Sequence, residues 1–161
     1  MYNNRLPNFG GLLTRRPQAL ANVTGSRAYP DIEGQVRFYG TSYGVLVVAD
    51  VLGLPRGVGE CDSPVFGFHI HEGDRCTGTE ADPFANARTH YNPYACAHPY
   101  HAGDLPPLLG ANGMAFAVCL SDRFTVEEII GGTVIIHARP DDFTTQPSGN
   151  AGAMMACGVI K

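Results

Sequence analysis

The stretch Gly67-Phe-His-Ile-His-Glu72 places two histidines two positions apart in an otherwise apolar run. The segment Val65–His71 is typical of a β-strand, on which successive side chains point to opposite faces of the sheet. His69 and His71 therefore share one face, and Ile70 points to the other face, into the expected core. A polar sheet face that carries two histidines by chance would give the same short pattern.

Other strand-like segments lie on both sides of this stretch. From Ala19 onward the chain looks extended, and in Asp31–Tyr39 the residues Ile32, Val36 and Phe38 share a face. Glycine and proline together make up 32 of 161 residues, 20 plus 12, which favours short strands joined by turns. We expect an all-β antiparallel sandwich or barrel of about eight strands, the others being Tyr43–Val51, Met114–Leu120, Thr133–His137 and Met154–Ile160. Thr125-Val-Glu-Glu128 resembles a capping box and predicts one helical turn, ended by Gly131-Gly132.

Composition excludes several classes of protein. The chain has the length of one domain, a net charge of −4 and a single lysine, Lys161, so a nucleic-acid partner is not expected. No apolar run is long enough to span a membrane. The first twenty residues lack the apolar core of a signal peptide, so we expect a cytoplasmic protein unless a leader has been removed.

The segment between Glu72 and Gly113 has no regular pattern, and a loop of this length in a small domain usually has a function. Three imidazoles and one carboxylate are a complete tetrahedral set for zinc, and with no position left for water such a zinc is structural. The alternative is a loop whose polar side chains face water. The residues that would form the zinc set are His90, His98, His101 and Asp104.

The remaining histidines suggest a second metal. His137 ends the strand Thr133–His137, and together with His69, His71 and one loop histidine it would supply four nitrogen donors. Four imidazoles suit copper(II), which prefers a near-planar arrangement. If one imidazole serves both metals, His90 is the candidate, since it is the loop histidine nearest the strand pair in sequence.

These motifs, in this order, resemble the copper/zinc superoxide dismutase family. The resemblance extends over about residues 19–160 and includes the motifs Gly67–Glu72, His90–Pro93, His101–Leu105 and Gly149–Ile160, and the Val-Ile-Ile-His that ends at His137 with the following Asp141. It implies a Greek-key antiparallel β-sandwich or flattened barrel with long metal-binding loops. Residues 1–18 would then form a polar N-terminal arm, and residues 19–161 the superoxide dismutase-like domain.

The resemblance also implies roles for individual residues. Asp141 matches a carboxylate that hydrogen-bonds one ligand histidine of each metal, and Cys76 and Cys157 match a disulfide. Cys119 is expected to be a small buried residue, and the state of Cys61 and Cys96 is open. The implied copper ligands are His69, His71, His90 and His137, and the implied zinc ligands are His90, His98, His101 and Asp104.

The expected activity is the disproportionation of superoxide to oxygen and hydrogen peroxide by redox-active copper beside structural zinc. The alternative is a copper- and zinc-binding protein of the same fold with little turnover, either a metal buffer or a copper-delivery domain. A homodimer is a further expectation, and the arm could pack on a partner subunit.

One departure from the family pattern favours the alternative. The family has an arginine near copper that attracts the superoxide anion, and Met154 stands at that position here. We therefore expect a rate below the diffusion limit. Arg139 is the best candidate for a replacement because it lies two residues past His137, while Arg75 and Arg88 are weaker candidates.

Overall fold

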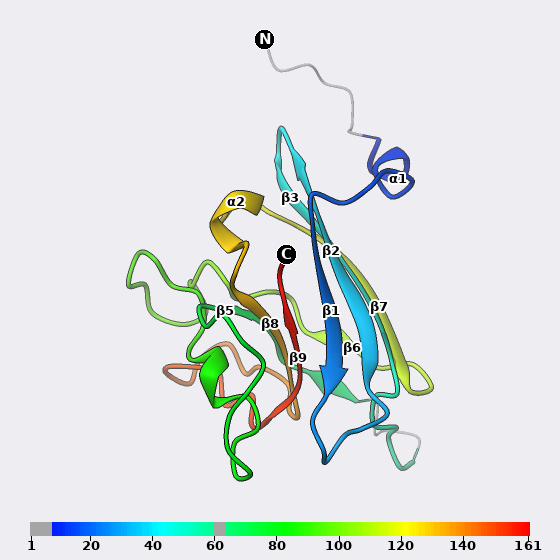
Figure 1. Ribbon diagram of the computed structural model, residues 1–161, viewed down its shortest axis with the longest axis vertical. Helices are drawn as coiled ribbons and strands as arrows, with labels where there is room; N and C mark the ends of the chain where they lie inside the picture. Colours follow the sequence, from blue (N-terminus) through cyan, green and yellow to red (C-terminus); the bar gives the residue numbers. More distant parts are fainter. Residues whose placement is uncertain (1–7, 60–63) are drawn as a thin grey trace.

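The computed structural model describes residues 8–59 and 64–161. In this part of the chain seven strands form one antiparallel sheet in the order β5-β8-β9-β1-β2-β3-β7, and β4 pairs with β6 separately. The sheet curls around its inner face (Figure 1). The strands of the large sheet are β1 (Ala19–Gly25), β2 (Glu33–Thr41), β3 (Gly44–Leu52), β5 (Phe68–His71), β7 (Met114–Ser121), β8 (Thr133–His137) and β9 (Met154–Val159).

The topology is that of a Greek key. Strands β1, β2 and β3 pair in chain order, and β9 returns from the far end of the sequence to lie beside β1. This is the spatial order of a Greek key, in which the last strand pairs with the first. The predicted fold class is therefore confirmed. The small strands β4 (Val65–Phe66) and β6 (Leu108–Leu109) lie outside the large sheet.

One core fills the inside of the curled sheet. Val36 and Phe38 are buried there together with Ile32, as their predicted common face requires. Ile70 lies in the same core, so its neighbours His69 and His71 point to the other side of β5. His69 and His71 thus project from a strand whose opposite face packs against the core.

The structure corrects the prediction of one continuous strand over 65–71. The chain breaks at Gly67, so that β4 pairs with β6 whereas β5 pairs with β8. The Gly67 N–H donates to the Arg139 carbonyl at 2.7 Å, and the Gly67 carbonyl accepts from the His137 N–H at 2.8 Å. A Cβ at position 67 would lie only 2.8 Å from the Cβ of Ala151, so this close approach of the backbone requires glycine.

The predicted capping box is present. Helix α2 (Val126–Ile129) begins after Thr125, whose hydroxyl accepts from the Glu128 N–H while the Glu128 carboxylate accepts from the Thr125 N–H. Gly131 follows with a φ of +91°, the left-handed conformation that ends a helix. The other short helical turns are α1 (Phe9–Leu12) and η1 (Ala85–Ala87).

The predicted disulfide between Cys76 and Cys157 is also present. It joins the loop after β5 to β9 across a sequence separation of 81 residues. A cross-link of this span stabilises the fold by about 4–5 kcal/mol in the chain-entropy model. It fixes the start of the loop that leads to His90. Cys96 is exposed and Cys119 is half-buried, and both are free thiols, whereas Cys61 lies outside the described residues.

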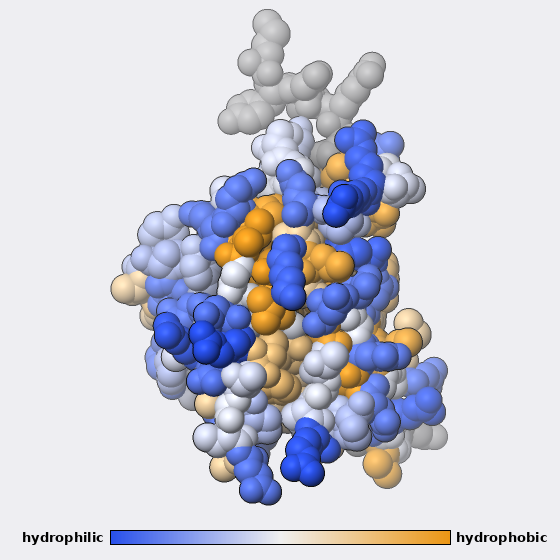
Figure 2. All heavy atoms as spheres, viewed as in Figure 1, coloured by the Kyte–Doolittle hydropathy of each residue, from blue (hydrophilic) through white to orange (hydrophobic). Residues whose placement is uncertain are grey.

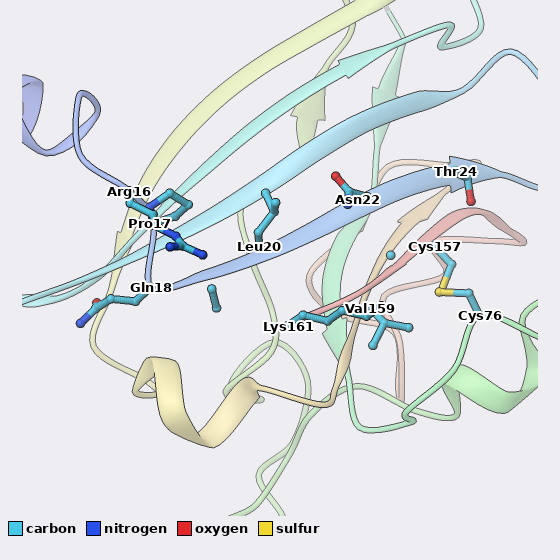
Figure 3. Close-up of a pocket in the computed structure, with 12 residues that line it drawn as sticks. Arg16, Pro17, Gln18, Leu20, Asn22, Thr24, Cys76, Cys157, Val159 and Lys161 are labelled. Atoms are coloured by element: carbon cyan, nitrogen blue, oxygen red, sulfur yellow. A yellow bond between two sulfur atoms is a disulfide. The ribbon is translucent and has the colours of Figure 1, made fainter.

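The disulfide lies at one end of a groove of about 830 Å³ between β1 and β9 (Figure 3). Leu20 and Val159 give it an apolar floor, and Figure 2 shows apolar atoms gathered here among hydrophilic surroundings. Arg16 and Lys161 lie along its wall. None of the residues that line the groove is a histidine, so it is separate from the site described below.

The described part of the N-terminal arm is not wholly polar. Phe9, Leu12 and Leu13 pack on a small cluster that contains Tyr39 and Leu46, on the face of β2 and β3 opposite to the core. The arm thus contacts its own sheet at these positions. Among residues 8–59 and 64–161 no helix has the length and apolar character needed to cross a membrane.

Candidate metal centre

Three strand histidines and one loop histidine form a buried cluster, called here the cavity cluster. His69 and His71 come from β5, and His137 is the last residue of the neighbouring strand β8. His90 reaches them from the long loop and forms a β-bridge with His71. One potential ligand atom of each residue lies within 4.8 Å of the others. The structure thus brings together the four residues that the sequence analysis assigns to copper.

Four ring nitrogens in this cluster have no partner. They are buried, and within the described residues no hydrogen-bonding group reaches them. A buried polar atom without a partner is costly, and four at one place are typical of a metal-binding site. Imidazole nitrogens with free lone pairs are suitable ligands for copper. The atoms are His69 Nδ1, His71 Nε2, His90 Nε2 and His137 Nε2.

In two of these four rings, His71 and His137, the opposite nitrogen is held by the backbone. His71 Nδ1 donates to the Arg88 carbonyl at 2.9 Å, and His137 Nδ1 donates to the Gly152 carbonyl at 3.1 Å. A ring nitrogen that donates carries the proton, so the other nitrogen keeps its lone pair. The two carbonyls thereby set both the tautomer and the direction of each ring.

Burial favours the neutral, ligating form of these rings. Loss of solvent lowers the pKa of His137 to about 3 and holds the pKa of His71 well below its usual value. The pKa of His69 is also lowered, mainly by burial, although its hydrogen bond to Asp141 acts in the opposite direction. These three rings are therefore uncharged at neutral pH and do not repel a cation.

A second cluster, called here the loop cluster, lies beside the first and contains His90, His98, His101 and Asp104. The Nδ1 atoms of His90 and His98 lie 2.7 and 3.1 Å from the Asp104 carboxylate, and the Nδ1 atoms of His90 and His101 lie 3.4 Å apart. Tetrahedral zinc with nitrogen ligands at about 2.0 Å would separate neighbouring ligands by about 3.3 Å. The donor set and its spacing therefore fit zinc.

His90 belongs to both clusters. Its Nδ1 faces Asp104 in the loop cluster, while its Nε2 is one of the four unpartnered nitrogens of the cavity cluster. One imidazole can bind two metals in this way only if it gives up both ring protons. The geometry supports the bridging role that the sequence analysis proposes for His90.

Asp141 forms hydrogen bonds to one histidine of each cluster. Its Oδ2 accepts from His69 Nε2 at 2.7 Å, and its Oδ1 accepts from His98 Nε2 at 2.9 Å and from the Phe143 N–H at 2.7 Å. Burial raises the pKa of Asp141, but these hydrogen bonds outweigh burial and hold the pKa well below its usual value. A Cβ at Gly149 would lie 2.0 Å from Asp141 Oδ1, so glycine leaves the room that this arrangement needs.

A cavity of about 560 Å³ opens over the cavity cluster. His71, His90 and His137 lie in its wall, so three of the unpartnered Nε2 atoms belong to residues that a small molecule in the cavity would meet. Met154, at the position where the family has an arginine, lines the same cavity. The site therefore combines a metal cluster with access for a small substrate.

The sequence analysis expects Arg139 near the cavity cluster, but the structure places Arg88 in the cavity wall instead. Arg88 lines the cavity, whereas Arg139 is exposed and is not among the lining residues, and its side chain passes beside Gly152. Arg75 is exposed and bound to Asp74 through two hydrogen bonds. The sequence analysis ranks Arg88 low because its loop could not be placed. Its position two residues before His90 was the signal that it lies near the site.

Comparison with known proteins decides the family. The family model for copper/zinc superoxide dismutase matches residues 32–160, most of the chain. The chain belongs to the copper/zinc superoxide dismutase family. Copper and zinc are the cofactors of this family, and the two clusters supply donor sets of the right chemistry for both.

Members of the family resemble the chain along most of its length. The Cu-Zn superoxide dismutase of Legionella pneumophila is 37% identical over 136 residues, which cover 80% of this chain and 77% of that protein. The Cu-Zn superoxide dismutase of Photobacterium leiognathi is 33% identical, covering 80% and 78%. Among solved structures, the Cu/Zn superoxide dismutase from Brucella abortus matches with a TM-score of 0.74 at 26% identity, covering 89% of this chain and all of that one.

A superoxide dismutase-like protein from Bacillus subtilis, solved as a double mutant, matches almost as well. Its TM-score is 0.72 at 28% identity, with 86% of this chain and 94% of that chain covered. The predicted family and fold are thus confirmed by sequence and by structure.

Proposed function

We propose that this protein disproportionates superoxide to oxygen and hydrogen peroxide at the cavity cluster. The single observation that carries the proposal is the set of four unpartnered, buried histidine nitrogens beneath a cavity. The relatives are named Cu-Zn superoxide dismutases. Metal-centred chemistry on a small anion needs such a metal site with access for the substrate.

The site residues have distinct proposed roles. His69, His71, His90 and His137 hold copper, and His90, His98, His101 and Asp104 hold zinc. Bound copper supplies a centre that alternates between two oxidation states, so that two superoxide ions and two protons give one oxygen and one hydrogen peroxide. Asp141 orients His69 and His98, one residue of each cluster.

His90 is the residue to which we assign the proton step. Its Nδ1 is held in the loop cluster, so the ring stays in place whether or not Nε2 carries a proton. Its Nε2 belongs to the cavity cluster, and His90 lines the cavity where peroxide would form. A proton held at Nε2 between the two half-reactions can therefore be delivered to the product.

A superoxide-consumption assay tests the proposal against its alternative. We expect the protein loaded with copper and zinc to consume superoxide catalytically, and the protein loaded with zinc alone to be inactive. A protein that binds about one copper and one zinc per chain without catalytic consumption would instead be a metal buffer or delivery domain.

Three finer statements stay proposals. We propose residues 1–18, of which 1–7 lie outside the described residues, as an arm to the domain 19–161, and we propose a cytoplasmic protein. We also propose a homodimer, because β7 ends the large sheet and exposes four apolar side chains, each 43–58% exposed, on one face. A second copy of β7 would cover this face in a twofold contact. The four residues are Met114, Phe116, Val118 and Leu120.

We expect sedimentation to show a dimer at micromolar concentration, and a monomer at all concentrations would refute the proposed homodimer.

A further inference from the structure

The proposed substrate is an anion, and the protein is acidic. A net charge of −4 repels superoxide at long range, so a rapid reaction needs local positive charge near the cavity. Met154 lines the cavity without supplying any charge. If the proposed function holds, another side chain of the cavity wall must attract the substrate.

Arg88 is the cation in that wall. Apart from the metal-site histidines, Arg88 and Asp82 are the lining residues with ionisable side chains that are charged at neutral pH. The Arg88 side chain is exposed, and within the described residues it makes no ion pair. Its carbonyl accepts from His71 Nδ1 at 2.9 Å, which fixes the backbone of Arg88 directly beside the cavity cluster.

The backbone of Arg88 gives an independent indication. It has a φ of +62° and a ψ of −138°, a conformation that glycine adopts easily and that arginine rarely adopts. A non-glycine residue in such a conformation beside a functional site suggests that its side chain is needed there. The carbonyl alone would serve His71 equally well in a glycine.

Several other charged side chains near the site have hydrogen-bond partners of their own, and Arg139 passes beside Gly152 without lining the cavity. Asp74 is bound to Arg75, and Glu72 accepts from the Thr89 hydroxyl at 3.3 Å. Arg123, near the loop cluster, donates to two backbone carbonyls. Asp82 is the opposing charge in the cavity wall and weakens the attraction.

We propose that Arg88 attracts superoxide into the cavity and holds it over the cavity cluster, in place of the arginine that Met154 replaces. The guanidinium group then comes from a different element than in the family pattern. Arg88 lies in the loop before His90, whereas the family's arginine position, Met154 here, is the start of β9.

The test compares Arg88→Gly with the wild type, both loaded with copper and zinc. Glycine fits the backbone at this position, so the variant should fold and keep its metals. We expect kcat/KM at low ionic strength to fall about tenfold, the lower end of the range for electrostatic steering. The decrease of the wild-type rate with added salt should become weaker or vanish, because the attraction that salt screens is gone.

Matched variants separate charge from structure. Arg88→Lys should keep most of the rate and of its salt dependence, Asp82→Asn should raise the rate, and Met154→Arg should restore it in the Arg88→Gly background. Arg27→Gly removes the same charge from an exposed turn outside the cavity and should change neither value. A larger loss in Arg139→Ala than in Arg88→Gly would overturn the proposal in favour of Arg139.

A binding measurement tests Arg88 without turnover. Azide, a small anion, can be titrated into the copper-loaded protein and followed by the visible absorption of copper. We expect its Kd to rise about tenfold in Arg88→Gly and to stay near the wild-type value in Arg88→Lys. Unchanged azide affinity together with unchanged salt dependence would refute the role of Arg88. An inactive wild type whose azide affinity still depends on Arg88 would refute the proposed function but not the anion site.

Discussion

Replacing His71 with alanine is expected to abolish superoxide consumption and copper binding while zinc stays bound. His71 offers Nε2 to the cavity cluster, uses Nδ1 for the Arg88 carbonyl, and has no atom in the loop cluster. The loss should exceed the roughly 10–100-fold that is common when a residue supporting a ligand is replaced. Metal analysis of the purified variant, together with the activity assay, measures both effects.

The corresponding test of the loop cluster is His101→Ala. His101 belongs to the loop cluster and not to the cavity cluster, so its replacement should remove zinc first. Loss of zinc from His71→Ala to the same extent as copper would show that the division of ligands between the two clusters is wrong.

The second large effect is expected for Asp141→Asn, which should weaken both metal sites at once. The carboxylate accepts from His69 on one oxygen and from His98 on the other. An asparagine has one acceptor oxygen, and its NH₂ group would face a ring N–H that needs an acceptor. Loss of such a supporting contact commonly costs about 10–100-fold in metal affinity. Competition with a chelator measures the affinity for each metal.

The neighbouring residue provides the control. Asp142 is exposed, and its carboxylate accepts from Thr144 and Thr145 in a turn, without contact to a histidine. Asp142→Asn removes the same charge and should leave both affinities near the wild-type values. Equal effects of the two substitutions, or no effect of Asp141→Asn, would contradict the connecting role of Asp141.

Parts of the histidine clusters were predictable from local patterns, whereas the meeting of His137 with the others was implied by the family resemblance. The spacing of His69 and His71 fixes their common face on a strand, and the tight grouping from His90 to Asp104 needs only a short loop to converge. The capping box at Thr125 is likewise a local signal. Each of these features is decided within a few residues.

Features that depend on tertiary packing were not predictable. The break at Gly67 follows from the close approach to Ala151, which is 84 residues away. The partial burial of Phe9 depends on its contact with the face of β2 and β3 opposite to the core. The position of Arg88 follows from the path of a loop that the disulfide and its own hydrogen bonds fix. The sequence puts Arg88 two residues before His90, but it does not show the path of that loop, so it could not rank Arg88 above Arg139.

The most direct test of the account is a crystal structure of the metal-loaded protein, with diffraction measured at the copper and zinc absorption edges. We predict copper bound by the four unpartnered nitrogens of the cavity cluster and zinc bound by the loop cluster, with His90 contacting both or, in the reduced form, zinc alone. Metals found elsewhere, or a single metal spread over both clusters, would contradict the central claim that the chain builds a copper/zinc centre around His90.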